Sequence, residues 1–213
     1  ELLVSLLTFL MAWEWLRFSS LKFPSLWDVI VDSAILIAVV SEYLGWSLIA
    51  FVVLVFVGGL LYFHPSIKKL EGARHCALGI ILFGAFIISC ITLRYTPGLG
   101  LEFTVWILLT VWSTDLGAYF FGRFIGGWRL ASRISPNKTW AGLGGGVITA
   151  SVSSGVWLTW IGYSDLAIAL IIGGICGCIA QLGDMTMSAV KRHFGVKDSS
   201  NLIPGHGGVI DRL

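Results

Sequence analysis

Apolar residues fill most of the chain in seven long runs that short polar clusters separate. The runs cover residues 1–17, 27–41, 44–63, 76–95, 101–122, 140–162 and 165–190. A helix needs about 20 apolar residues to cross the hydrocarbon core of a membrane, and prolines between the runs are expected to end helices. The pattern therefore predicts an all-α, polytopic bundle of about seven transmembrane helices. The first two runs are short, and the first contains Glu14.

The composition excludes an ordinary soluble domain. Hydrophobic residues make up 56% of the chain and charged residues only 12%, whereas about 25% of a typical soluble domain is charged. The ten Trp and 26 Gly residues suit a membrane bundle, with Trp at the interfaces and Gly where helices approach closely. The four Cys residues stand in apolar surroundings and are expected to pack as reduced thiols. Because Glu1 lies inside an apolar run and Leu213 inside a polar motif, we expect both natural ends to be missing.

The segments between the runs alternate between two sides of the membrane, and the cations collect on one of them. The first side receives the longer segments, which are 18–26, 64–75, 123–139 and 191–213. The second side receives 42–43, 96–100 and 163–164. Thirteen of the 14 Lys and Arg residues lie in or next to the first group, and only Arg94 lies next to the second. Since cytosolic loops are rich in Lys and Arg, the first side is predicted to be cytosolic.

Asp115 lies in the fifth apolar run and Asp184 in the seventh. Each stands about seven residues before its run ends on the cytosolic side, roughly 10 Å deep at 1.5 Å per residue. An ionisable residue in a membrane is a functional-site hypothesis by default, and the alternative is a pair that only tethers helices. Residues three or four apart share a helix face, which groups Gln181, Asp184, Ser188 and Lys191 on one helix and Asp115, Tyr119 and Gly122 on the other. These faces predict a polar, water-accessible funnel that opens to the cytosol.

The loop 123–139 carries a candidate phosphate-binding element. Ser135-Pro136 resembles a helix N-cap followed by proline at the first helical position. Free amide donors at such a helix end, with Lys138 and Thr139 beside them, suit a phosphate. The alternative is a basic juxtamembrane loop that contacts anionic lipid. Gly142 and Gly146 are expected to serve helix packing rather than nucleotide binding.

Residues 188–212 combine several cations, two carboxylates and closely spaced glycines. The glycines allow a backbone to approach a ligand, the cations can clamp phosphates and the carboxylates can hold a divalent metal. His206 lies between two glycines, which favours a place in the site. The segment therefore indicates phosphoryl or nucleotidyl transfer rather than a hydrolase triad.

The same segment resembles the signature of the phosphatidate cytidylyltransferases, also called CDP-diacylglycerol synthases. The matching residues are Ser188, Arg192, Lys197, Asp198, Pro204, Gly205, His206, Gly207, Gly208, Asp211 and Arg212. Residues 115–123 and 135–140 resemble two further shared stretches of the family. The resemblance is close over the second half of the chain and rests mainly on hydrophobic spans over the first. Ala141 departs from the family, whose members commonly carry Glu there, and the family signature continues past Leu213 to another Asp and a last span.

This resemblance implies a membrane enzyme that converts CTP and phosphatidic acid into CDP-diacylglycerol and pyrophosphate with the help of Mg²⁺. It implies that Asp184 and Asp211 hold the metal, with Asp198 or Asp115 nearby. The remaining implied catalytic residues are Lys197 and Arg212, and the implied substrate-binding residues are Ser135, Lys138, Thr139, Ser188, Lys191, Arg192, His206 and Gly207.

The resemblance also implies a place in a bacterial inner membrane, with the active site facing the cytosol. Residues 1–100 are expected to form N-terminal transmembrane helices, and residues 101–213 the catalytic helices and loops. The expected partners are CTP, phosphatidic acid and membrane lipids, without nucleic acid, and the glycine-rich spans permit a homodimer. Two other functions stay open at this point: a CTP-dependent kinase of lipid alcohols, and an ion or proton transporter that uses Asp115 and Asp184.

Overall fold

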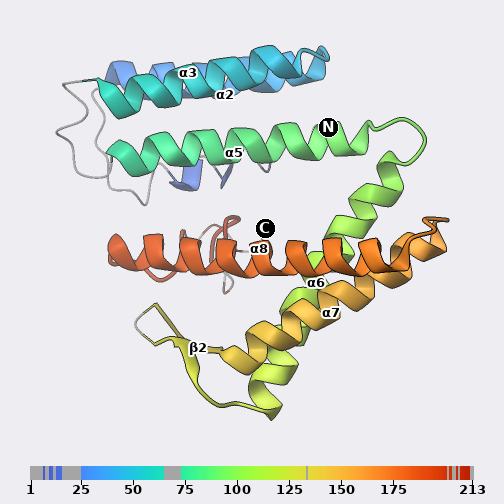
Figure 1. The fold of residues 1–213 in the computed structure, drawn as a ribbon. Helices are drawn as coiled ribbons and strands as arrows, with labels where there is room; N and C mark the ends of the chain where they lie inside the picture. The colour runs from blue at the N-terminus through green and yellow to red at the C-terminus, as the bar shows by residue number, and fades with distance from the viewer. Residues whose placement is uncertain are drawn as a thin grey trace. The chain divides into compact units, whose positions relative to one another are not determined.

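A computed structural model describes residues 7, 10–11, 13–15, 25–64, 73–132, 134–200, 202, 205 and 207–211. These residues form helices almost throughout, with one short two-stranded sheet (Figure 1). The elements are α2 (Ser25–Tyr43), α3 (Ser47–Phe63), α5 (Ala73–Arg94), α6 (Gly100–Phe124), β1 (Arg129–Ala131), β2 (Ser135–Thr139), α7 (Trp140–Trp160) and α8 (Leu166–His193).

Helices α2, α3, α5, α6, α7 and α8 match six of the seven apolar runs to within a few residues. Within the described ranges, four stretches are long and apolar enough to cross a membrane: Ala77–Arg94, Gly100–Phe124, Trp140–Trp160 and Leu166–His193. Shorter apolar stretches lie in α2 and α3. The predicted all-α membrane bundle is therefore confirmed. The first run lies mostly outside the described residues, and the number of spans and the polar funnel stay predictions.

The chain divides into two compact units. The first contains Glu1–Tyr95 together with Phe194–Leu213, and the second contains Thr96–His193. The residues after α8 thus group with the first helices of the chain, and we call 194–213 the C-terminal segment. The predicted division of function near residue 100 stays a prediction.

In the first unit, α2 and α3 lie side by side and α5 packs against α3 (Figure 1). Glycines allow α3 and α5 to approach closely. A Cβ on Gly58 would lie 2.7 Å from Ile81, and a Cβ on Gly84 would overlap Leu54. Trp15 packs on α5 as well, because its Nε1 donates to the backbone oxygen of His75 over 3.0 Å. Trp15, which directly follows Glu14, is therefore held against α5.

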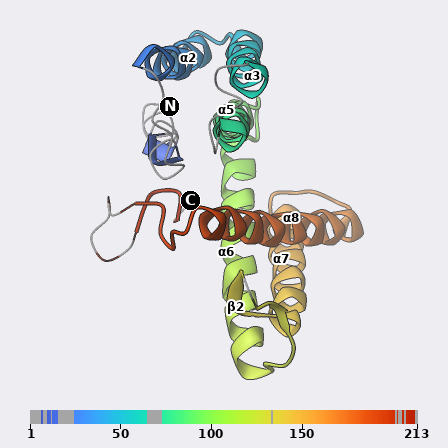
Figure 2. The same ribbon diagram turned by 90° about the vertical axis from the view of Figure 1, so that its left-hand side faces the viewer.

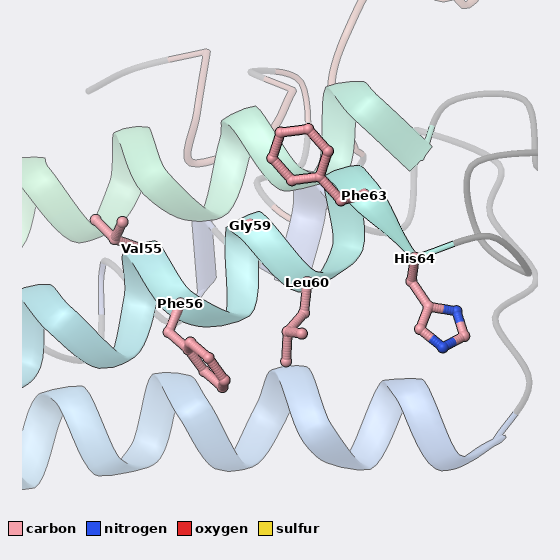
Figure 3. Close-up of a pocket in the computed structure, with 6 residues that line it drawn as sticks. All are labelled: Val55, Phe56, Gly59, Leu60, Phe63 and His64. Carbon is pink, nitrogen blue, oxygen red and sulfur yellow. The ribbon is translucent and has the colours of Figure 1, made fainter.

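One face of α3 is left open. Figure 3 shows a shallow hollow of ≈ 470 Å³ along this helix, lined by Val55, Phe56, Gly59, Leu60, Phe63 and His64. Phe56 and Phe63 are both largely exposed. Apart from His64 the lining is apolar, so the hollow suits lipid tails or a neighbouring helix and lacks the charged groups that a nucleotide needs.

In the second unit, α6 and α7 run antiparallel along each other and α8 crosses α7 (Figures 1 and 2). Close contacts join α6 to α7: a Cβ on Gly142 would lie 2.8 Å from the backbone oxygen of Ala118, and one on Gly146 2.9 Å from that of Thr114. The predicted packing role of these two glycines is confirmed. Thr149 adds a hydrogen bond of 2.8 Å from its Oγ1 to the Ser113 oxygen across the same interface.

Candidate functional site

The connection between α6 and α7 is a β-hairpin. Its strands β1 and β2 pair antiparallel, with Arg129 opposite Thr139 and Ala131 opposite Ser135. Gly126 and Gly127 both have positive φ, at 66° and 93°, and lead the chain out of α6. The hairpin was not predicted from the sequence, because its strands are short and lack an alternating apolar pattern.

The predicted N-cap at Ser135 is wrong. Ser135 lies in β2, and α7 begins at Trp140, where Thr139 Oγ1 accepts a hydrogen bond from Gly142 N over 3.1 Å. The physical reason is the proline: the residue before a proline is restricted to extended backbone, and Pro136 needs no ladder donor on a strand of a two-stranded sheet. The helix N-terminus is therefore four residues later than expected, directly after Lys138.

The centre of the candidate site is an ion pair between this hairpin and α8. Lys138 Nζ lies 2.5 Å from Asp184 Oδ2, and the two side chains are 24% and 60% exposed. Asp115 on α6 interacts electrostatically with both groups. The structure thus brings together three of the sequence-predicted residues, which come from three different elements of one unit.

Packing of α8 on α7 positions Asp184. Gln181, nearly one turn earlier, is buried and its Nε2 donates to the Leu143 backbone oxygen over 3.0 Å. Ser154 on α7 likewise donates to the Ala169 oxygen of α8 over 2.7 Å and accepts from Trp106 of α6 over 2.9 Å. These bonds hold the register of the three helices, so the Asp184 carboxylate is presented to the hairpin.

A second pair of polar residues lies one turn beyond Asp115. Tyr119 accepts a hydrogen bond of 3.0 Å from Arg123 Nη1, and the guanidinium lies 6.0 Å from the tyrosine ring centre. Both residues are on α6, and Tyr119 is exposed. Arg123 is thus a further cation on the same helix as Asp115, and the sequence signal for it was its place at the end of one of the family-like stretches.

Asp211 organises the C-terminal segment in the first unit. Its Oδ2 accepts from Ser199 N over 2.8 Å, from Ser199 Oγ over 2.9 Å and from Gly208 N over 3.0 Å. A Cβ on Gly207, whose φ is 86°, would lie 2.8 Å from the same oxygen. The glycine run therefore allows the backbone to wrap around this carboxylate.

Glu14 has contacts to which sequence reasoning assigned no role. Its side chain is completely buried and accepts hydrogen bonds from four donors of the C-terminal segment. The available signal was an ionisable residue inside an apolar run, which the same reasoning used for Asp115 and Asp184.

The other predicted site residues are distributed over both units. Ser188, Lys191 and Arg192 follow Asp184 on α8, whereas Lys197 and Asp198 are exposed residues of the C-terminal segment. His206 and Arg212 lie outside the described residues. The predicted pairing of Asp184 with Asp211 at a metal involves both units and stays a prediction.

Asp115 and Asp184 of the second unit are carboxylates of the kind that can bind a divalent cation. Among the described residues, no group of three His, Cys, Asp or Glu side chains could hold a metal. Mg²⁺, however, is commonly bound by one or two carboxylates together with waters and substrate phosphates. Asp184 and Asp115 are such carboxylates, and the Lys138 ammonium on Asp184 already places a cation there.

The long apolar helices fit a membrane protein, and the Lys138–Asp184 ion pair lies next to the first residues of α7. The chain belongs to the cytidylyltransferase family, whose profile matches residues 1–213, and it is therefore a nucleotidyltransferase. The resemblance drawn from its motifs is confirmed.

The chain is similar to the phosphatidate cytidylyltransferases of three bacteria. It is 36% identical to a phosphatidate cytidylyltransferase of Staphylococcus saprophyticus over 98% of this chain and 82% of that protein. It is 42% identical to the phosphatidate cytidylyltransferase of Brucella suis over 64% of this chain and 51% of that protein. It is also 42% identical to the Haemophilus influenzae protein of that name, over 60% of this chain and 48% of the relative.

Proposed function

We propose that this protein transfers the cytidylyl group of CTP to phosphatidic acid, forming CDP-diacylglycerol and pyrophosphate in phospholipid biosynthesis. The observation that carries the proposal is the Lys138–Asp184 ion pair beside Asp115, because it offers a cation for phosphate and carboxylates for a metal in a membrane nucleotidyltransferase. The names of the relatives supply the substrate class.

The proposed reaction is a single displacement at phosphorus. An anionic oxygen of phosphatidate attacks the α-phosphorus of CTP, and a new P–O bond forms. The bond from the α-phosphorus to the oxygen that bridges to the β-phosphorus breaks, and its electron pair leaves with pyrophosphate. Because the nucleophile is already anionic, the site has to orient the reactants and stabilise charge rather than remove a proton.

In the proposal, residues of the second unit orient the reactants and stabilise charge. Lys138 binds a phosphate oxygen at the N-terminus of α7, where backbone amides add partial positive charge. Asp184, with Asp115 nearby, holds Mg²⁺, which when bound neutralises phosphate charge. Ser135, Thr139 and Ser188 supply hydrogen bonds beside these groups, and Lys191 and Arg192 supply further positive charge.

The C-terminal segment, which belongs to the first unit, carries further residues with proposed roles. Lys197 and Arg212 neutralise the triphosphate and the lipid phosphate, and Asp198, His206 and Gly207 contact the substrates. Asp211 is the second metal ligand in this proposal. The site faces the cytosol of a bacterial inner membrane, where CTP arrives from water and phosphatidic acid from the bilayer, and a homodimer is compatible with these roles.

Identification of the lipid product tests this function. Full-length protein in detergent is incubated with CTP, Mg²⁺ and either phosphatidic acid or diacylglycerol, and the lipids are analysed by mass spectrometry. We expect CDP-diacylglycerol from phosphatidic acid and no product from diacylglycerol. Phosphatidic acid formed from diacylglycerol would instead identify a lipid-alcohol kinase and contradict the proposal.

A further inference from the structure

Glu14 is a buried carboxylate whose partners all lie in the C-terminal segment. Its side chain has 0% exposure. Oε1 accepts from Val209 N over 2.8 Å and from Ser200 Oγ over 2.6 Å. Oε2 accepts from Ile210 N over 2.9 Å and lies 3.2 Å from Ser199 Oγ. Two donors therefore converge on each oxygen.

All four groups around Glu14 can donate, which suits a carboxylate that accepts through both of its oxygens. Backbone amides can only donate, and both of them point at Glu14 oxygens. A carboxylate accepts through both oxygens, whereas a glutamine would turn an NH₂ group towards one of the amides. Hydrogen bonds to a charged acceptor are stronger than neutral ones, and an unsatisfied buried donor is costly.

The backbone approaches this carboxylate closely. A Cβ on Gly208 would lie 2.6 Å from Oε2 and 2.7 Å from Oε1 of Glu14, and it would overlap Ser199 Oγ. A side chain at position 208 is therefore incompatible with these bonds. Trp15, the next residue in the chain, packs on Gly79 and Phe83 of α5.

The residues that bind Glu14 also bind or directly precede Asp211. Ser199 Oγ lies 2.9 Å from Asp211 Oδ2 and 3.2 Å from Glu14 Oε2, so its one hydroxyl proton is shared between two carboxylates. Val209 and Ile210, whose amides bind Glu14, directly precede Asp211. The conformation of the backbone that carries Asp211 thus depends on a residue almost 200 positions earlier, as the separation of 195 between Glu14 and Val209 shows.

We infer that Glu14 is a positioning residue for cytidylyl transfer: it holds the C-terminal segment in the conformation that binds the nucleotide. The role of Glu14 in catalysis rests on the proposed function. Its role in ordering the segment rests on the hydrogen bonds alone. Without Glu14 the segment samples other conformations. The apparent affinity for CTP then falls in proportion to the fraction of molecules whose segment is in the conformation that binds CTP.

The test compares Glu14→Gln with the wild type in the full-length protein. We expect the KM for CTP to rise by about 10- to 100-fold while kcat at saturating CTP falls by less than about threefold. Amide hydrogen exchange at Val209 and Ile210 is expected to accelerate by a similar factor, with exchange in α6 and α7 unchanged. Glu14→Asp keeps the charge and is expected to recover part of both losses.

Glu102→Gln is the matched control, since it makes the same substitution in the first turn of α6, within the other unit. We expect it to leave KM, kcat and exchange unchanged. Unaltered exchange at Val209 and Ile210 and unaltered KM in Glu14→Gln would overturn the inference. If the wild type shows no cytidylyl transfer but the exchange change occurs, the proposed function fails and the ordering role stands.

Ser200→Ala serves if Glu14→Gln does not fold. It removes one of the four donors and leaves both carboxylates in place. Faster exchange at Val209 together with a higher KM for CTP in this variant would support the inference, and no change in either would refute it.

Discussion

Asp184→Asn is expected to lower the rate of cytidylyl transfer by about 10²–10³-fold, the range found when one group that stabilises developing charge is removed. The substitution keeps the shape of the side chain but removes the charge that faces Lys138 and, in the proposal, Mg²⁺. The measurement is the initial rate of CDP-diacylglycerol formation at saturating CTP over a range of Mg²⁺ concentrations. We expect the variant to need more Mg²⁺ for its remaining activity.

The fold is expected to tolerate this change. Asp184 is 60% exposed, and a half-exposed ion pair contributes at most about 1 kcal/mol. Asp165→Asn is the control: Asp165 Oδ1 accepts from Ile168 N at the other end of the same helix, and Asn is an equally good cap. It should retain full activity. Near-wild-type activity in Asp184→Asn would remove this residue from the site.

Asp211→Asn is a less selective test. Its Oδ2 accepts three hydrogen bonds from Ser199 and Gly208, so an amide in its place disturbs the C-terminal segment as well as any metal. A loss of activity in that variant would not separate the two effects. The Asp184 variant does separate them, because within the part of the chain that the structure describes Asp184 forms an ion pair with Lys138 and no comparable set of backbone contacts.

Gly146→Val is expected to destabilise the second unit by about 1–3 kcal/mol or more, because it overpacks a close helix contact. A Cβ at this position would lie 2.9 Å from the Thr114 backbone oxygen and would overlap Gln181 Nε2. The backbone oxygen cannot move without shifting α6, and Gln181 is the residue that fixes α8 on α7. Thermal unfolding in detergent and the transfer rate should therefore both decrease.

Gly144→Val is the matched control on the same helix. No atom lies within 4 Å of a Cβ at Gly144, so the substitution should change the free energy of unfolding by no more than about 0.5 kcal/mol. Equal stability of the two variants would contradict the close packing of α6, α7 and α8.

The helices were predictable from the sequence because hydrophobic length and proline position are local signals. Pro65 and Pro97 stand in breaks between apolar runs, and α3 and α5 end within a few residues of them. The hairpin was not predictable in this way, because two short strands that contain Pro136 show no periodic pattern. As a result, the start of α7 was misplaced from Thr139 to Ser135.

The site was predictable in its residue types and less so in its contacts. Asp115 and Asp184 were identified because a carboxylate in an apolar run costs free energy, and Lys138 was identified by its charge in a loop. Their mutual contact depends on how α6, α7 and α8 pack, which no local pattern encodes. Glu14 was missed because its partners lie at the far end of the chain.

The most direct test of cytidylyl transfer follows the phosphorus atoms of CTP. Full-length protein in detergent is supplied with phosphatidic acid, Mg²⁺ and CTP labelled at either the α- or the γ-phosphate. We expect the α-label to enter the lipid and the γ-label to be released in pyrophosphate. Entry of γ-label into the lipid, or of neither label while a known active enzyme works under the same conditions, would contradict it.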